Sequence, residues 1–328
     1  MTCDADTHHV VDQVAVHEGE DGNGHEVFVR SWRHQSPATA SGREDGSMYF
    51  GAHVRSGGGV WHAIENGVEI GAEAVQFFAG SPRTWKPTLY KKQDAEQFRT
   101  MRADSPIRFV VIHTIYLINL ATENEDFYEK SVTALCGALR AADQLGADAI
   151  VTHIGSHQGS GFSAGLERVR LALRRALADS EGSTVKLLLE NTAGAGGTMG
   201  VDFLELGQII DAAGGDPRLG ICVDTAHIYE SGADLRTREG VDQVLRELDD
   251  GCGPDRLVML HLNDSKTPLG SNRDRHENIG DGDLGEAAFS LLVNEPAFRD
   301  LPGILEVPGL DGRGPDRENL DRLRALVR

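Results

Sequence analysis

Nine histidine and acidic residues that could bind metal ions stand at, or just after, the ends of short apolar segments of this 328-residue chain. The segments VVIH, IVTH, LLLE, VMLH and GILE each run into one such side chain, and ICVDTAH and RDRH each carry two. When the strands of one sheet end on such side chains, the side chains gather at one end of that sheet. The pattern therefore predicts a single polar cluster formed by His113, His153, Glu190, Asp224, His227, His261, Asp274, His276 and Glu306.

The predicted cluster combines five imidazoles with four carboxylates, a set that is costly to bury without cations. Mixed nitrogen and oxygen ligands favour Zn²⁺, with Mn²⁺ or Fe²⁺ as substitutes, whereas Mg²⁺ prefers oxygen ligands alone. A catalytic zinc ion uses about three protein ligands, so nine ligands can hold up to three ions. Three such ions outweigh four carboxylates in charge, and an acidic protein can thus present a cationic pocket to a phosphate. His53, which ends the first apolar segment, is expected to support the cluster or contact a phosphate.

Apolar segments alternate with amphipathic segments of helical period from Met48 onward. Eight strand-then-helix units predict a (β/α)₈ TIM barrel, an α/β fold whose active site lies at the carboxyl ends of the strands. A doubly wound open sheet is the alternative, but no glycine-rich dinucleotide loop follows the first strand. We expect strands at 47–54, 73–78, 108–113, 148–153, 185–190, 219–224, 257–262 and 302–307, with helices at 60–71, 128–146, 166–180 and 201–215.

Composition divides the chain into an acidic, disordered N-terminal extension at 1–46 and a barrel domain at 47–328. The net charge is −19, which argues against a broad basic surface for nucleic acid. The four cysteines form no CxxC pair, so any metal must rest on nitrogen and oxygen ligands. No apolar segment approaches the roughly 20 residues of a membrane span, and the N-terminus lacks the apolar core of a signal peptide. We expect a cytoplasmic protein that does not enter membranes.

Several longer segments resemble the signature sequences of one enzyme family. They are GAHVRSGGG, IHTIYLINLAT, THIGSHQGSG, LLLENTAGAGGTMG, GICVDTAHIYESGADLRT, MLHLNDSKTPLGSNRDRHENIGDGDLG and ILEVPG. Together they resemble the endonuclease IV family of apurinic/apyrimidinic endonucleases, in unbroken order from about Phe50 to about Glu306. The resemblance implies a trinuclear zinc centre that hydrolyses the phosphodiester bond 5′ to an abasic site in double-stranded DNA. The products would carry a 3′-hydroxyl and a 5′-deoxyribose phosphate.

The resemblance also implies a role for each site residue. One zinc would be held by His113, His153 and Glu190, a second by Glu190, Asp224, His261 and Glu306, and a third by His227, Asp274 and His276. Glu190 would bridge two ions and orient the attacking hydroxide, which makes it the catalytic residue. Arg83, Tyr116 and Leu117 match the residues that bind the substrate by entering the base stack at the abasic site. The chain departs from the family pattern at Gly80, Ser81, Thr114 and Ile115, which affects contacts with DNA more than metal chemistry.

Two other functions fit parts of the same pattern. Sugar isomerases and epimerases of the same barrel superfamily use one or two divalent ions, but their sites contain more carboxylates and fewer imidazoles. A damage-recognition or metal-binding module would keep the ligands and lack turnover. Three ions per chain and strand scission at an abasic site distinguish the nuclease, which we expect to act as a monomer, from both.

Overall fold

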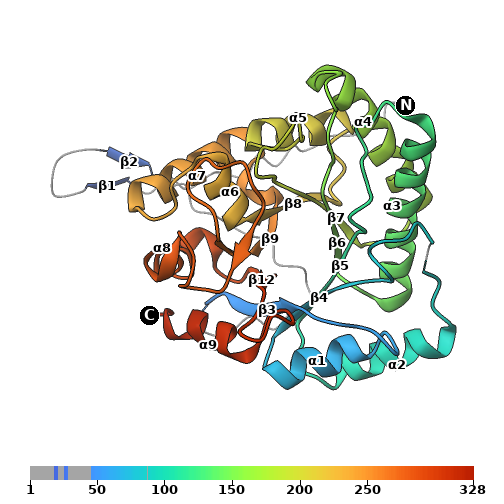
Figure 1. Cartoon of the computed structure of the whole chain (residues 1–328), viewed down its shortest axis with the longest axis horizontal. Coiled ribbons are helices and arrows are strands. Elements are labelled where there is room, and N and C mark those ends of the chain that lie inside the picture. Colours follow the sequence, from blue (N-terminus) through green and yellow to red (C-terminus); the bar gives the residue numbers. More distant parts are fainter. Residues whose placement is uncertain (1–17, 21–25, 29–45, 87) are drawn as a thin grey trace, which may run out of the picture. The chain divides into compact units, whose positions relative to one another are not determined.

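Eight parallel strands close into a barrel within the part of the chain that the computed structural model describes, residues 18–20, 26–28, 46–86 and 88–328. Neighbouring strands follow one another along the chain, and the last strand pairs with the first (Figure 1). The predicted TIM barrel is confirmed, with a strand in each predicted segment. The strands are β3 (Tyr49–His53), β4 (Ala74–Phe78), β5 (Phe109–His113), β6 (Ala149–Thr152), β7 (Lys186–Glu190), β8 (Leu219–Asp224), β9 (Leu257–His261) and β12 (Pro302–Leu305).

The barrel interior explains why ligand-type side chains meet at one end. Buried side chains inside the barrel include those of Val111, Val151, Leu188, Cys222, Met259 and Ile304. Each of these residues stands two positions before a predicted ligand. Because alternate residues of a strand face the same side, the ligands continue this interior layer toward the carboxyl ends of the strands.

Helices surround the barrel (Figure 1). The four predicted helical segments are confirmed as α1, α3, α4 and α5. Helix α3 begins where the Asn124 side chain accepts a hydrogen bond from the Phe127 amide, and it ends at Gly146, whose φ of 63° suits a residue without a side chain. The helices are α1 (His62–Ile70), α2 (Lys92–Ala103), α3 (Glu125–Leu145), α4 (Phe162–Asp179), α5 (Phe203–Ala212), α6 (Thr225–Ser231), α7 (Arg238–Gly251), α8 (Gly285–Leu292) and α9 (Arg317–Ala325), with 3₁₀ turns η1 (Pro254–Arg256) and η2 (Pro296–Phe298).

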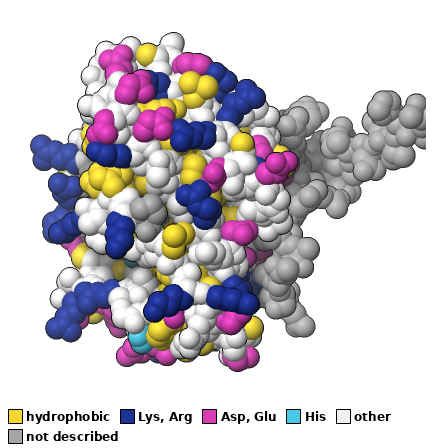
Figure 2. All heavy atoms as spheres, turned by 90° about the vertical axis from the view of Figure 1, so that its right-hand side faces the viewer, with side chains coloured by type: hydrophobic (Ala, Val, Ile, Leu, Met, Phe, Trp, Pro, Cys, Tyr) yellow, Lys and Arg dark blue, Asp and Glu magenta, His cyan; other side chains and the backbone are white. Residues whose placement is uncertain are grey.

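The outer face of the barrel around α3 carries charges of both signs. Figure 2, which views the side of the barrel that bears α3, shows Lys and Arg side chains interspersed with Asp and Glu. Salt bridges connect α3 to α4, and the N–O distance is 2.8 Å for Arg168–Glu125 and 2.7 Å for Arg175–Glu129. A third bridge joins Arg140 to Asp179. Three arginines of this helix pair therefore have acidic partners on the neighbouring helix.

Two short strands precede the barrel, β1 (Glu18–Glu20) and β2 (Glu26–Phe28), and they pair antiparallel. The remainder of the predicted N-terminal extension lies outside the described residues. Its disorder and the domain boundary after residue 46 stay predictions. No helix in the described ranges is long and apolar enough to cross a membrane.

Candidate metal centre

The nine predicted ligands meet at the carboxyl end of the barrel. They form overlapping groups in which the potential ligand atoms lie within 4.8 Å of one another. Two of these groups correspond to the first two predicted zinc sites, and they share Glu190. The groups are His113, His153 and Glu190; Glu190, Asp224, His261 and Glu306; Asp224, His227 and His276; and His227, Glu230 and Asp274.

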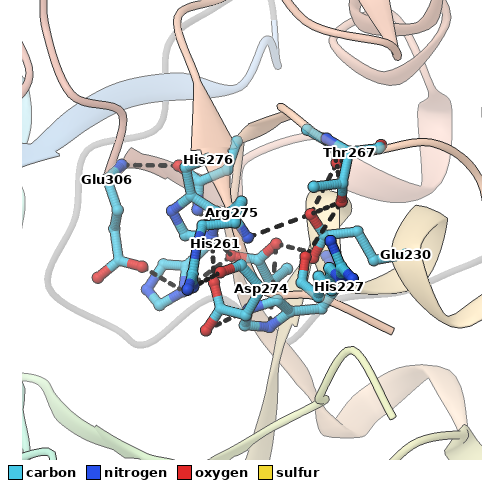
Figure 3. A network of polar contacts seen from close by, with 12 residues as sticks. His227, Glu230, His261, Thr267, Asp274, Arg275, His276 and Glu306 are labelled. Atoms are coloured by element: carbon cyan, nitrogen blue, oxygen red, sulfur yellow. Dashed lines mark hydrogen bonds and ion pairs between the residues drawn. The ribbon is translucent and has the colours of Figure 1, made fainter. Parts of the chain in front are cut away.

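The third predicted site differs in detail from its expected composition. Asp224 groups with His227 and His276, where Asp274 was expected. Asp274 still lies near both imidazoles, with one oxygen 3.3 Å from His227 Nε2 and the other 3.4 Å from His276 Nε2. Figure 3 shows the Asp274 side chain close to the His227 imidazole. The three residues predicted for the third site, which we call the third set, thus lie together. Asp224 lies close both to them and to the ligands of the second site.

Local backbone structure explains how the two segments that carry two ligands each, ICVDTAH and RDRH, place both side chains in the cluster. In the first segment, Asp224 is the N-cap of α6, and its carboxylate accepts a 2.9 Å hydrogen bond from the His227 amide. The cap therefore holds the imidazole one turn away from the carboxylate. In the second segment, His276 belongs to β11 (His276–Glu277), which pairs antiparallel with β10 (Asp264–Ser265) just after β9. This hairpin returns the chain to the barrel mouth.

Outer hydrogen bonds fix the orientation of three imidazoles. His113 Nδ1 lies 2.7 Å from the Thr114 carbonyl oxygen, His227 Nδ1 2.9 Å from the Asn191 carbonyl oxygen, and His261 Nε2 2.9 Å from Gln76 Oε1. An oxygen of this kind only accepts hydrogen bonds, so each of these nitrogens donates. The other nitrogen of each ring then directs its lone pair into the cluster, as in histidine ligands of metal ions.

Three buried polar atoms of the cluster have no hydrogen-bond partner among the described residues. They are Glu190 Oε2, His227 Nε2 and His276 Nε2. Buried polar atoms are paired in the great majority of cases, because an unpaired one loses its hydration without compensation. Divalent cations would pair all three, so the donor set fits bound metal.

The electrostatics of the cluster favour ionised carboxylates. Burial alone raises the pKa of Glu190, but the imidazoles of His153, His261 and His113 together hold that pKa well below its usual value. Burial alone lowers the pKa of His261, but Cys222, Glu306 and Glu190 together raise it well above its usual value. Anionic carboxylates therefore persist at neutral pH, where cations can compete with imidazolium for them.

Two supporting amides were not recognised from the sequence. Gln76 is fully buried, and besides accepting from His261 it donates to Glu306 Oε1 at 2.5 Å. Asn263 donates to Asp224 Oδ2 at 2.6 Å and accepts the Glu306 amide at 2.8 Å. A polar residue inside the apolar run AVQFF, two positions after the interior Ala74, was the available signal for Gln76.

A cavity of about 920 Å³ opens over the cluster, and its walls include His113, His153, Asp274, His276 and Glu306. Of the three predicted substrate-binding residues, Tyr116 lines this cavity. Its ring is 64% exposed and meets the ring of Phe78 edge-on at 5.1 Å. Leu117 is half-buried and Arg83 is exposed, and both lie outside the cavity lining. Arg83 makes no hydrogen bond or ion pair with any described residue.

Known proteins are similar in sequence to this chain along most of its length. Residues 64–326 match the family model for the xylose isomerase-like TIM barrel. The chain is 42% identical over 278 residues to a probable endonuclease 4 of Chloroflexus aurantiacus, a match that covers 85% of this chain and 98% of the relative. It is 44% identical over 280 residues to a probable endonuclease 4 of Methanoculleus marisnigri, covering 85% and 99%.

Solved structures that share this fold differ in how similar their sequences are to this chain. The crystal structure of endonuclease IV from Thermus thermophilus matches with a TM-score of 0.75 and 35% identity, covering 85% of this chain and 98% of that chain. A D-tagatose 3-epimerase-like protein matches with a TM-score of 0.62 but only 17% identity, which shows a common fold alone. This chain belongs to the endonuclease IV family of xylose isomerase-like TIM barrels.

Proposed function

We propose that this protein is a DNA repair nuclease that hydrolyses the phosphodiester bond 5′ to abasic sites in double-stranded DNA with three zinc ions. The products would carry a 3′-hydroxyl and a 5′-deoxyribose phosphate. Membership of the endonuclease IV family supports the nuclease activity. The observation that carries the metal mechanism is the sharing of Glu190 between two ligand groups that lie under an open cavity.

The two oxygens of Glu190 face different groups. Glu190 Oε2 lies 3.5 Å from His113 Nε2 and 3.6 Å from His153 Nε2, whereas Oε1 lies 3.0 Å from His261 Nδ1. One carboxylate can thus serve a first ion through one oxygen and a second ion through the other. This division supports a bridging role for Glu190, which would make it essential for the reaction.

The remaining ligands complete three sets in the proposed centre. His113 and His153 would complete the first, and Asp224, His261 and Glu306 the second. The third would be formed by His227, Asp274 and His276. When bound, the ions supply Lewis-acid activation and charge neutralisation for a phosphodiester, and Mn²⁺ or Fe²⁺ would substitute for zinc.

Recognition of the abasic site is proposed to involve Tyr116, Leu117 and Arg83. Tyr116 offers a largely exposed aromatic ring at the cavity wall, where the unpaired base opposite the lesion can stack. Leu117 follows it on the same loop and would enter the base stack beside it. Arg83, which lies on the loop after β4, would approach the DNA from the opposite side of the gap left by the missing base.

Incision of a defined duplex tests this function. The metal-loaded protein is incubated with DNA that carries one tetrahydrofuran abasic analogue, and with the matched undamaged duplex. We expect incision at the analogue alone, with a 3′ end that a DNA polymerase extends, and about three zinc ions per chain by elemental analysis. Epimerisation or isomerisation of ketoses without strand scission would show that the protein is a sugar enzyme and not a nuclease. Tight binding of abasic DNA without scission would show that it is a recognition module.

A further inference from the structure

A buried acid that the proposed mechanism does not use lies next to the third set. Glu230 belongs to α6, three residues after His227, and its side chain is fully buried. Its potential ligand atom lies within 4.8 Å of those of His227 and Asp274. Figure 3 shows Glu230 beside Thr267 and Arg275, on the far side of His227 from Glu306.

The two oxygens of Glu230 have different surroundings. Oε1 accepts hydrogen bonds from Ser265 Oγ at 2.7 Å, from Thr267 Oγ1 at 3.1 Å and from the Arg275 amide at 3.2 Å. Oε2 is buried and has no hydrogen-bond partner among the described residues. The three donors hold the carboxylate rigidly, and they leave one buried oxygen that needs a positive partner.

A cation is the partner that this oxygen lacks. Protonation does not solve the problem, because a buried hydroxyl on Oε2 would need an acceptor in place of a donor. A buried anionic oxygen without a partner is strongly destabilising, and a nearby divalent ion would remove that cost. His227 Nε2 of the neighbouring set is also buried without a hydrogen-bond partner among the described residues, and Asp274 Oδ2 lies 3.3 Å from it. A divalent ion beside these atoms would serve the imidazole nitrogen and the carboxylate oxygens together.

We infer that Glu230 is an additional carboxylate ligand of the third metal set, beside His227 and Asp274. The inference rests on the proposed metal centre and extends it. A fifth carboxylate lowers the positive surplus of three divalent ions, and it adds an oxygen donor to a set that already holds two imidazoles. Oxygen-rich sets favour Mn²⁺ relative to Zn²⁺, so the third set should exchange zinc for manganese most readily.

Zinc binding by the full-length Glu230→Gln variant tests the inference. Glutamine keeps an acceptor for Ser265, Thr267 and the Arg275 amide but removes the negative charge. Metal-depleted protein is dialysed against buffered Zn²⁺ and the bound metal is counted by elemental analysis. We expect wild type to bind three ions, and the variant to bind two normally and the third about 10- to 100-fold more weakly. In wild type, the third set should exchange Zn²⁺ for Mn²⁺ more readily than the other two sets do. In the variant, this difference between the sets should disappear.

Two control variants separate the charge of Glu230 from its other roles. Thr267→Val removes one hydrogen bond to Oε1, and Glu295→Gln neutralises another buried acid, which pairs with Arg238. Glu295→Gln should retain three ions with wild-type affinity, and Thr267→Val should weaken the third ion much less than Glu230→Gln does, because two of the three donors to Oε1 remain. If Glu230→Gln also retains them, or if Thr267→Val loses the third ion to the same extent, the ligand role is wrong. If wild type itself binds fewer ions or fails to incise abasic DNA, the proposed function fails first, so the two failures are distinguishable.

Discussion

The carboxyl end of the barrel and the α3–α4 face are both rich in charged groups, but they use them differently. On the helix face, Arg168 and Arg175 pair with exposed glutamates across two neighbouring helices. At the barrel end, imidazoles and carboxylates are buried, and several of their atoms have no hydrogen-bond partner among the described residues. The number of charges does not distinguish the two regions. The burial of imidazole and carboxylate groups together does, because exposed charges are satisfied by water and buried ones require another charge.

The largest effect should follow from Glu190→Gln at the barrel end. An amide carries no charge and has only one acceptor oxygen, so it cannot serve both the His113 and His261 groups as the carboxylate can. We expect incision of abasic DNA to fall roughly 10³-fold or more, as for the loss of an essential catalytic group. Single-turnover incision measures this, and a thermal melt checks that the variant is folded. Undiminished cleavage would refute the bridging role.

Gln76→Leu should have a smaller effect at the same end. It leaves the His261 Nε2–H without its acceptor and removes the hydrogen bond to Glu306, so two ligands of the second set lose their support. We expect metal affinity to fall about 10- to 100-fold, measured by competition with a chromophoric chelator. Gln243→Leu is the matched control, since Gln243 is exposed on α7 and its side chain donates a hydrogen bond to Glu247, which belongs to none of the ligand groups. Equal affinities for the two variants would show that Gln76 merely fills space.

Arg83→Ala addresses the loop outside the cavity. We expect the preference for abasic over intact duplex to fall about tenfold, equivalent to about 1.4 kcal/mol, while metal content stays unchanged. Competition binding with the two duplexes measures the preference, and Arg246→Ala on the exposed side of α7 serves as control. Loss of zinc from the Arg83 variant would mean that Arg83 supports the metal ligands and that its assignment to DNA recognition is wrong.

Arg175→Ala on the helix face should have the smallest effect. It breaks the exposed pair with Glu129, and such pairs contribute about 0–1 kcal/mol to folding. We expect a change of that size in the free energy of unfolding, measured with urea, and no change in incision. A large loss of incision would show that the helix face, like the barrel end, contributes to the reaction.

Much of this molecule could be predicted from the sequence, and the exceptions have a common physical cause. The strands are continuous apolar runs, and the ligands stand in register with the residues inside the barrel, so His113 and Glu190 could be identified from their positions alone. Asp224 lies close to the third set as well as the second, because its Oδ1 caps α6 while its Oδ2 lies between His261 and His276. The spacing of residues along the sequence does not reveal this position. Glu230 and Gln76 become notable only when their partners, distant in sequence, are known. The relation of Arg83 to the cavity depends on a loop whose path has no periodic signal.

The α3–α4 face also bears on how such a protein would travel along DNA. Arginines that already pair with glutamates displace few counterions from a polyanion, so this face is a weak track for sliding. Encounters with undamaged duplex should therefore be brief, with the search proceeding by repeated dissociation and three-dimensional diffusion. A shallow dependence of nonspecific affinity on salt concentration would be its signature, and a steep one would point to a basic track elsewhere on the chain.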